Sequence, residues 1–176
     1  MANYFTILDL PASLALDVEA VEGSWRERAK SSDDASLHEA RATLTDPVNR
    51  LEHWLATHEV TPERGSSIDP NMMDLFSCLH GVLADTDRVI EGLRSSTTAL
   101  TKALLSKDAI AAQLEIQGCM KTIREEKESR IARFPEFEKA ASEDHFDAAV
   151  GTLGQLKFLR KWEQQCQERL LTMLEY

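Results

Sequence analysis

The chain contains 176 residues, of which 20 are Lys or Arg and 30 are Asp or Glu, so its formal charge is −10 with neutral histidines. This acidic excess argues against nucleic acid as a partner, because affinity for the phosphate backbone comes from clustered Lys and Arg. Hydrophobic residues make up 43% of the chain, which is enough to build a core. No stretch approaches the roughly 18 consecutive apolar residues of a membrane span, and the first residues lack the pattern of a secretion signal. We therefore expect a globular, cytoplasmic protein that does not bind membranes.

Residues 1–62 have the apolar spacing of several short helices around one small core. Asp17 can cap a helix that ends in the segment 30–34. Ser36 and Glu39 fit a capping box for the next helix, and Asp46-Pro47 fits the N-cap and the first position of a third. We expect Tyr4-Phe5 to pack against a core that contains Trp25, Leu44 and Leu51.

The segment between the two halves of the chain, residues 61–67, has the composition of a linker and no apolar spacing, which predicts a domain boundary there. Beyond it the helices lengthen, starting at Asp69-Pro70, with a break expected near residues 106–108. No alternating strand pattern of useful length occurs. We therefore predict an all-α fold with a first domain over residues 1–62 and an elongated three-helix bundle over residues 68–176.

The sequence offers few residues in patterns that are typical of catalysis or metal binding. The five histidines share no metal-ligand spacing, and no nucleotide-binding, hydrolase or metalloprotease motif occurs. The three cysteines, Cys78, Cys119 and Cys166, lie far apart without a CxxC pair, so we interpret them as buried or idle reduced thiols. These observations predict no catalytic residues, no cofactor and no metal, and therefore a protein that is not an enzyme.

Three segments carry a resemblance to a known family. The first is Asn3–Pro11, with Leu16-Asp17 shortly after it. The second is Ala40–Arg50, which contains an Asp-Pro-x-x-Arg exit from a helix and is followed by Trp54-Leu55. The third is Phe146–Leu159, in which an aromatic-Asp pair leads to a Leu-basic-Phe-Leu run. In this order and spacing the segments resemble the HscB-type J-domain co-chaperones of iron-sulfur cluster assembly. The resemblance implies a J-domain-like region followed by an HscB-like C-terminal bundle, whereas residues 86–143 agree only in being helical.

The loop that gives J-domains their activity differs here. J-domains stimulate the ATPase of a 70-kDa heat-shock chaperone through a His-Pro-Asp tripeptide after their second helix, which is usually basic. The corresponding loop contains Ser32, Asp33 and Asp34, and residues 17–30 before it hold four acidic and three basic side chains. We interpret the region as a degenerate J-domain that packs on the bundle and does not stimulate the chaperone, which argues against that chaperone as a partner. The alternative is that Asp33 or Asp34 still triggers hydrolysis.

In the same family an apolar patch of the C-terminal domain binds the iron-sulfur scaffold protein. The matching positions are Met72, Met73, Phe76, Lys157 and Phe158. A stripe of Met and aromatic residues can equally be bundle core, but Phe158 points away from the stripe of Leu156 and Leu159. Ser77 and His80 stand where the resemblance leads us to expect acidic residues.

The resemblance thus implies a non-catalytic, co-chaperone-like protein of iron-sulfur cluster assembly that binds a scaffold protein through its C-terminal bundle. Two alternatives remain open. One is a general helical scaffold or oligomerisation protein that shares only the architecture. The other is an enzyme whose pocket the sequence does not reveal, for which a deep cleft lined by convergent polar groups would be the sign.

Overall fold

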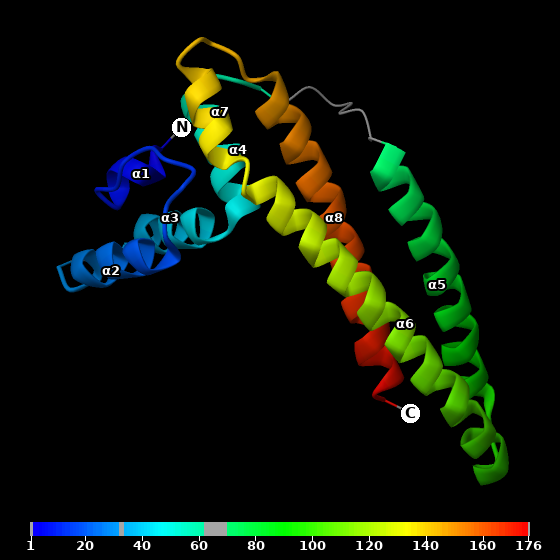
Figure 1. Ribbon diagram of the computed structural model, residues 1–176. Coiled ribbons are helices and arrows are strands. Elements are labelled where there is room, and N and C mark those ends of the chain that lie inside the picture. The colour runs from blue at the N-terminus through cyan, green and yellow to red at the C-terminus, as the bar shows by residue number, and fades with distance from the viewer. Residues whose placement is uncertain (1, 32–33, 62–69, 176) are drawn as a thin grey trace. The chain divides into compact units, whose positions relative to one another are not determined.

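The computed structural model describes residues 2–31, 34–61 and 70–175, and all regular structure within these ranges is helical (Figure 1). The predicted all-α class is therefore confirmed. None of the helices in these ranges is long and apolar enough to cross a membrane. The helices are α1 (Tyr4–Ile7), α2 (Val18–Ala29), α3 (Ala35–Thr45), α4 (Pro47–Thr57), α5 (Pro70–Ser95), α6 (Ala99–Ile131), α7 (Phe134–Ala141) and α8 (Asp147–Met173).

The chain divides into two compact units that do not follow the order of the sequence. The N-terminal unit comprises Met1–Ser66 together with Ser129–Leu156, and the three-helix unit comprises Ser67–Glu128 together with Lys157–Tyr176. The sequence places residues 129–156 in the second domain, so the structure differs from that division. Both α6 and α8 contribute residues to each unit.

Two of the predicted helix starts are confirmed by their caps. The Asp17 carboxylate accepts from the backbone N–H of Glu19 at 3.2 Å, and Asp46 accepts from the N–H groups of Val48 and Asn49 at 2.9 and 2.8 Å. These bonds satisfy backbone donors that have no partner within the first turn of a helix. The start predicted at Ser36 is wrong, because α3 begins at Ala35 and its N-cap is Asp34.

The core of the N-terminal unit contains most of the apolar residues expected there. Phe5, Leu44 and Leu51 are at most 1% exposed. Trp25 differs from the prediction, because it is only half-buried. Its ring is covered by the guanidinium of Arg41, which lies 4.3 Å from the ring centroid. A cation over the ring face replaces the apolar neighbours that a core position would have.

A buried arginine joins three segments of this unit. Arg50, the last residue of the Asp-Pro-x-x-Arg motif, is 4% exposed. Its Nη1 donates to the carbonyl oxygens of Leu16 at 2.9 Å and Leu44 at 3.0 Å. Burial lowers the pKa of Arg50, while the nearby carboxylates of Asp46 and Glu138 oppose that shift. The motif is therefore explained by a structural bond between α4, the end of α3 and the segment before α2.

Residues 129–156 belong to the N-terminal unit because their side chains complete its core. The ring of Phe146 lies 5.9 Å from that of Trp54, and Phe134 and Phe137 are each 2% exposed. The backbone N–H of Leu14 also donates to the carboxylate of Glu138 in α7. These contacts join residues more than ninety positions apart, which local spacing in the sequence does not reveal.

The three-helix unit consists of α5, the larger part of α6 and the C-terminal part of α8 (Figure 1). Ion pairs connect α8 to both other helices, from Lys127 to Glu163 at 2.6 Å and from Arg169 to Asp87 at 2.9 Å. The break predicted near residues 106–108 is wrong, since α6 continues through it. Ser106 is accommodated there because its hydroxyl donates to the carbonyl oxygen of Ala103 at 2.7 Å.

Candidate functional site

Three aromatic side chains gather on the surface of the three-helix unit, where α5 meets α8. The ring of Phe76 lies 5.8 Å from that of Trp162, and the ring of Phe158 lies 6.3 Å from it. Trp162 is 5% exposed, whereas Phe76 is 45% and Phe158 is 37% exposed. Trp162 therefore forms the floor of a surface patch whose outer faces are the two phenylalanines.

Met73 extends this surface by one helical turn, since it is 48% exposed and lies three residues before Phe76. We call Met73, Phe76 and Phe158, with Trp162 beneath them, the aromatic patch. Met72 was predicted to belong to the same surface, but it is 1% exposed. Consecutive residues of a helix point about 100° apart, so Met72 faces the core while Met73 faces solvent.

The border of the aromatic patch is polar and partly basic. The ring of His80 stacks on Phe76 at 6.2 Å, and the Ser77 hydroxyl donates to the Met73 carbonyl oxygen at 3.0 Å. Lys157, another predicted site residue, is exposed next to Phe158, and Lys161 is exposed one turn further along α8. The patch therefore offers apolar area flanked by positive charge on its α8 side.

Sequence reasoning brought together Met73, Phe76, Lys157 and Phe158 but missed Trp162. The signal was present, because Trp162 lies four residues after Phe158 and so shares its helix face. A buried tryptophan under two exposed rings is typical of binding surfaces, whose energy concentrates on aromatic anchors.

The predicted J-domain loop lies only partly within the described residues, because Ser32 and Asp33 fall outside them. Asp34 is the N-cap of α3, and its carboxylate accepts from the Ser36 backbone N–H at 3.1 Å. That hydrogen bond lowers the pKa of Asp34. Its role in this structure is therefore to start a helix.

The basic side chains of α2, the helix before this loop, and of its C-cap residue Lys30 are engaged in ion pairs. Arg26 pairs with Glu22 at 4.0 Å, Arg28 with Asp9 at 3.4 Å, and Lys30 with Glu27 at 2.7 Å. Each positive charge is thus offset by a carboxylate of the same unit.

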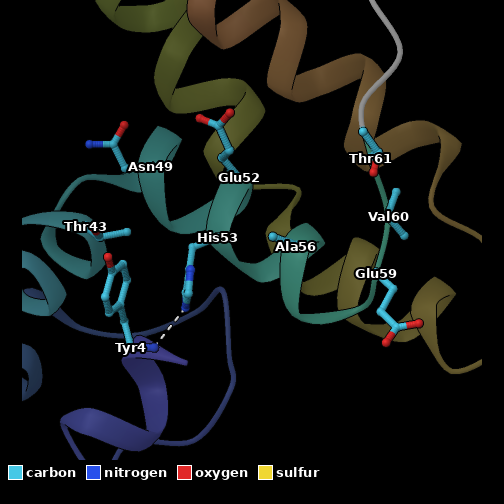
Figure 2. A pocket seen from close by; sticks show the side chains of 9 residues that line it. All are labelled: Tyr4, Thr43, Asn49, Glu52, His53, Ala56, Glu59, Val60 and Thr61. Carbon is cyan, nitrogen blue, oxygen red and sulfur yellow. Dashed lines mark hydrogen bonds between the residues drawn. The ribbon is translucent and has the colours of Figure 1, made fainter. Parts of the chain in front are cut away.

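A pocket of about 720 Å³ lies in the N-terminal unit beside α1 and α4 (Figure 2). His53 on its wall is 3% exposed, and its Nε2 accepts from the Tyr4 backbone N–H at 3.0 Å. Burial lowers the pKa of His53. The Tyr4 hydroxyl donates to Glu39 at 3.2 Å, and burial together with that carboxylate raises the pKa of Tyr4. Both groups are committed to structural bonds rather than to chemistry in the pocket.

No metal centre is found in the part of the chain that the structure describes, since no three His, Cys, Asp or Glu side chains there are arranged to hold an ion.

The structure is similar to that of the chaperone HscB from Vibrio cholerae. The TM-score is 0.59 with 18% sequence identity, and the similarity covers 95% of this chain and 96% of that chain. No protein-family model matches the sequence, and no curated protein does. The chain thus has an HscB-like helical fold over nearly its whole length, as the resemblance of the three segments predicts.

Proposed function

We propose that this protein is a non-catalytic, co-chaperone-like protein of iron-sulfur cluster assembly that binds a scaffold protein through the aromatic patch. The observation that carries the proposal is the exposure of Met73, Phe76 and Phe158 over Trp162, at the positions singled out by the family resemblance. Exposed aromatic anchors over a packed floor are what a protein partner needs to gain affinity from desolvation. The HscB-like fold supports the same class of partner.

The partner surface should be apolar at its centre and acidic at one edge. This follows from Lys161, which is exposed one helical turn after Phe158 on α8. Edge charges of this kind steer the encounter and fix orientation more than they add affinity. Salt should therefore weaken binding only modestly, while truncation of an aromatic anchor should weaken it strongly.

The test is calorimetric titration of the organism's own iron-sulfur scaffold protein. Phe158→Ala should weaken binding about thirty-fold, equivalent to about 2 kcal/mol, and Met73→Ala somewhat less. Leu114→Ala is the matched control, because Leu114 is 64% exposed on α6 and lies outside the patch. Each variant must melt like the wild type. No binding by the wild type would overturn the function, whereas equal binding by all variants would overturn the site.

We further propose that the N-terminal unit does not stimulate the ATPase of a 70-kDa chaperone. The ion-paired cations of α2 and the capping role of Asp34 support this proposal. Single-turnover ATP hydrolysis measures it, with a J-domain that contains His-Pro-Asp as the positive control. A several-fold acceleration by this protein that is lost in Asp33→Asn and Asp34→Asn variants would contradict it.

A second candidate function, an oligomerisation module that shares only the architecture, is favoured by one specific observation. The α6 side chains Leu100, Leu104, Ile110 and Leu114 are all more than half exposed. Their spacing places them on one face of the helix, away from the buried Ile116 and Ile123. Sedimentation at increasing protein concentration distinguishes this function, because it predicts self-association that Leu104→Glu abolishes and Phe158→Ala does not.

A further inference from the structure

The three cysteines of the chain come from three different helices and gather in the three-helix unit. Cys78 on α5 is exposed, Cys119 on α6 is 8% exposed, and Cys166 on α8 is fully buried. Burial, and after it the hydrogen-bonded Cys78 thiol, raises the pKa of Cys119. Burial and the nearby Cys119 raise the pKa of Cys166 to about 11. The sequence suggests idle thiols far apart, whereas the fold makes them neighbours.

Cys78 and Cys119 also line the same pocket, which has a volume of about 550 Å³ and lies between α5 and α6. Gly118 is next to Cys119 in its wall, and no atom lies within 4 Å of the place where a Cβ on Gly118 would stand. Gly118 is exposed at this edge of the pocket, so a small solute can enter the pocket from solvent.

We propose that Cys78 and Cys119 are a redox-active pair that forms a reversible disulfide on reaction with hydrogen peroxide, linking α5 to α6. The proposal stands on the shared pocket and the contact between the two thiols, and it does not depend on the scaffold-binding function.

The reaction proceeds in two balanced steps. The Cys78 thiolate attacks one peroxide oxygen, the O–O bond breaks, and the departing hydroxide takes up a proton to leave as water, so that Cys78 becomes a sulfenic acid. The Cys119 sulfur then attacks the Cys78 sulfur and the S–O bond breaks. The Cys119 proton goes to the leaving hydroxide, which forms a second water. In total two thiols lose two electrons and one peroxide is reduced to two waters.

Exposure assigns the roles of the three sulfurs. Cys78 is the group that meets the oxidant, because it is exposed at the pocket. Cys119 is 8% exposed, so the oxidant reaches it less readily than Cys78, and it acts as the resolving thiol once a sulfenic acid stands beside it in the shared pocket. Cys166 has no route to solvent and remains a thiol.

The new bond would leave the aromatic patch open. Phe76 lies on the side of α5 that contacts Trp162 of α8, while Cys78 lies on the side that faces α6. Oxidation is therefore expected to restrict α5 without covering Phe76.

The experiment treats the full-length protein with stoichiometric hydrogen peroxide and counts free thiols under denaturing conditions. The wild type should fall from three thiols to one, with a mass loss of two hydrogen atoms. Non-reducing digestion should recover the peptide that joins Cys78 to Cys119, and dithiothreitol should restore all thiols. The oxidised form should melt at a higher temperature than the reduced form, because the cross-link restricts the unfolded chain.

Variants assign the partners. The Cys166→Ser variant retains Cys78 and Cys119, and oxidation should still remove both of these thiols. The Cys119→Ser variant should accumulate a Cys78 sulfenic acid that dimedone traps. Cys78→Ser should keep both thiols, and it must melt like the reduced wild type. Recovery of a Cys119–Cys166 bond, of a Cys78–Cys78 link between two molecules, or of three unreacted thiols in the wild type would overturn the proposal.

Discussion

The two units differ in what they leave at their surfaces. In the N-terminal unit the cations of α2 are paired with carboxylates, Asp17, Asp34 and Asp46 cap helices, and Arg50 binds two carbonyl oxygens. In the three-helix unit, by contrast, methionine and phenylalanine side chains remain exposed over a buried tryptophan. The comparison indicates that the first unit uses its polar groups to hold itself together, while the second leaves large apolar side chains exposed to solvent.

The largest expected effect tests the core of the N-terminal unit. Trp54 is 2% exposed and its ring contacts both Phe146 and His58, at 5.9 and 4.4 Å. Trp54→Ala should lower the free energy of unfolding by about 3 to 5 kcal/mol, the usual cost of truncating a buried aromatic residue. Urea unfolding followed by circular dichroism measures it. The half-buried Trp25 is the control. An equal loss of stability in Trp25→Ala would show that Trp54 contributes no more to the core of this unit than Trp25 does.

The next effect separates core from surface within the three-helix unit. Met72 and Met73 are adjacent, but they are 1% and 48% exposed. Met72→Ala should lower the free energy of unfolding by about 2 to 4 kcal/mol, because it leaves a cavity, whereas Met73→Ala should change it by less than about 1 kcal/mol. Thermal and urea unfolding of the two variants measure the difference. Equal losses of stability in Met72→Ala and Met73→Ala would mean that the two side chains are not divided between core and surface.

A third prediction concerns the buried arginine. Arg50→Met should cost about 2 to 3 kcal/mol, since it leaves the buried Leu44 carbonyl oxygen and the partly buried Leu16 carbonyl oxygen without their charged donor. Arg26→Met provides the control, because the Arg26 side chain is 71% exposed and its ion pair is long. That change should fall within about 0.5 kcal/mol of the wild type. If both variants unfold at the same urea concentration, Arg50 does not join the three segments as described.

The smallest effect is a pH dependence carried by His53. Its pKa in the folded protein is lowered from the ordinary value of 6.5, so the unfolded chain takes up the proton first as the pH falls. The contribution of His53 to the free energy of unfolding should therefore be fully present above pH 6.5. It should decline as the pH falls below that value, and it should stop changing below the pKa of His53 in the folded protein. Protonation would also remove the Nε2 lone pair that accepts from Tyr4. Unfolding curves of the wild type and of His53→Gln measure the dependence, which should be weaker in the variant.

Local features of the fold could be predicted from the sequence, and non-local ones could not. Asp17 and Asp46-Pro47 start helices because capping depends on neighbours within one turn. Helix α7 and the grouping of residues 129–156 with the N-terminal unit were missed, since they depend on contacts such as that between Phe146 and Trp54. The expected break near residues 106–108 failed because a serine and two charged residues are tolerated on a solvated helix face.

The candidate site shows the same division. The exposure of Phe158 followed from its place outside the leucine stripe of α8, which is a property of one helix. The separation of Met72 from Met73 and the presence of Trp162 beneath the patch depend on how α5 meets α8. The clustering of three distant cysteines is likewise a property of the bundle, because each lies on a different helix.

The discontinuous make-up of the N-terminal unit has a consequence for synthesis on the ribosome. The unit begins with the first residues of the chain, but Phe134, Phe137 and Phe146 complete its core only much later. Chains emerge at roughly 5 to 20 residues per second, so the apolar face of α4 remains uncovered while α5 and α6 are being made. A nascent chain stopped before residue 129 should be sensitive to protease in its first 60 residues, and one extended past residue 156 should be protected.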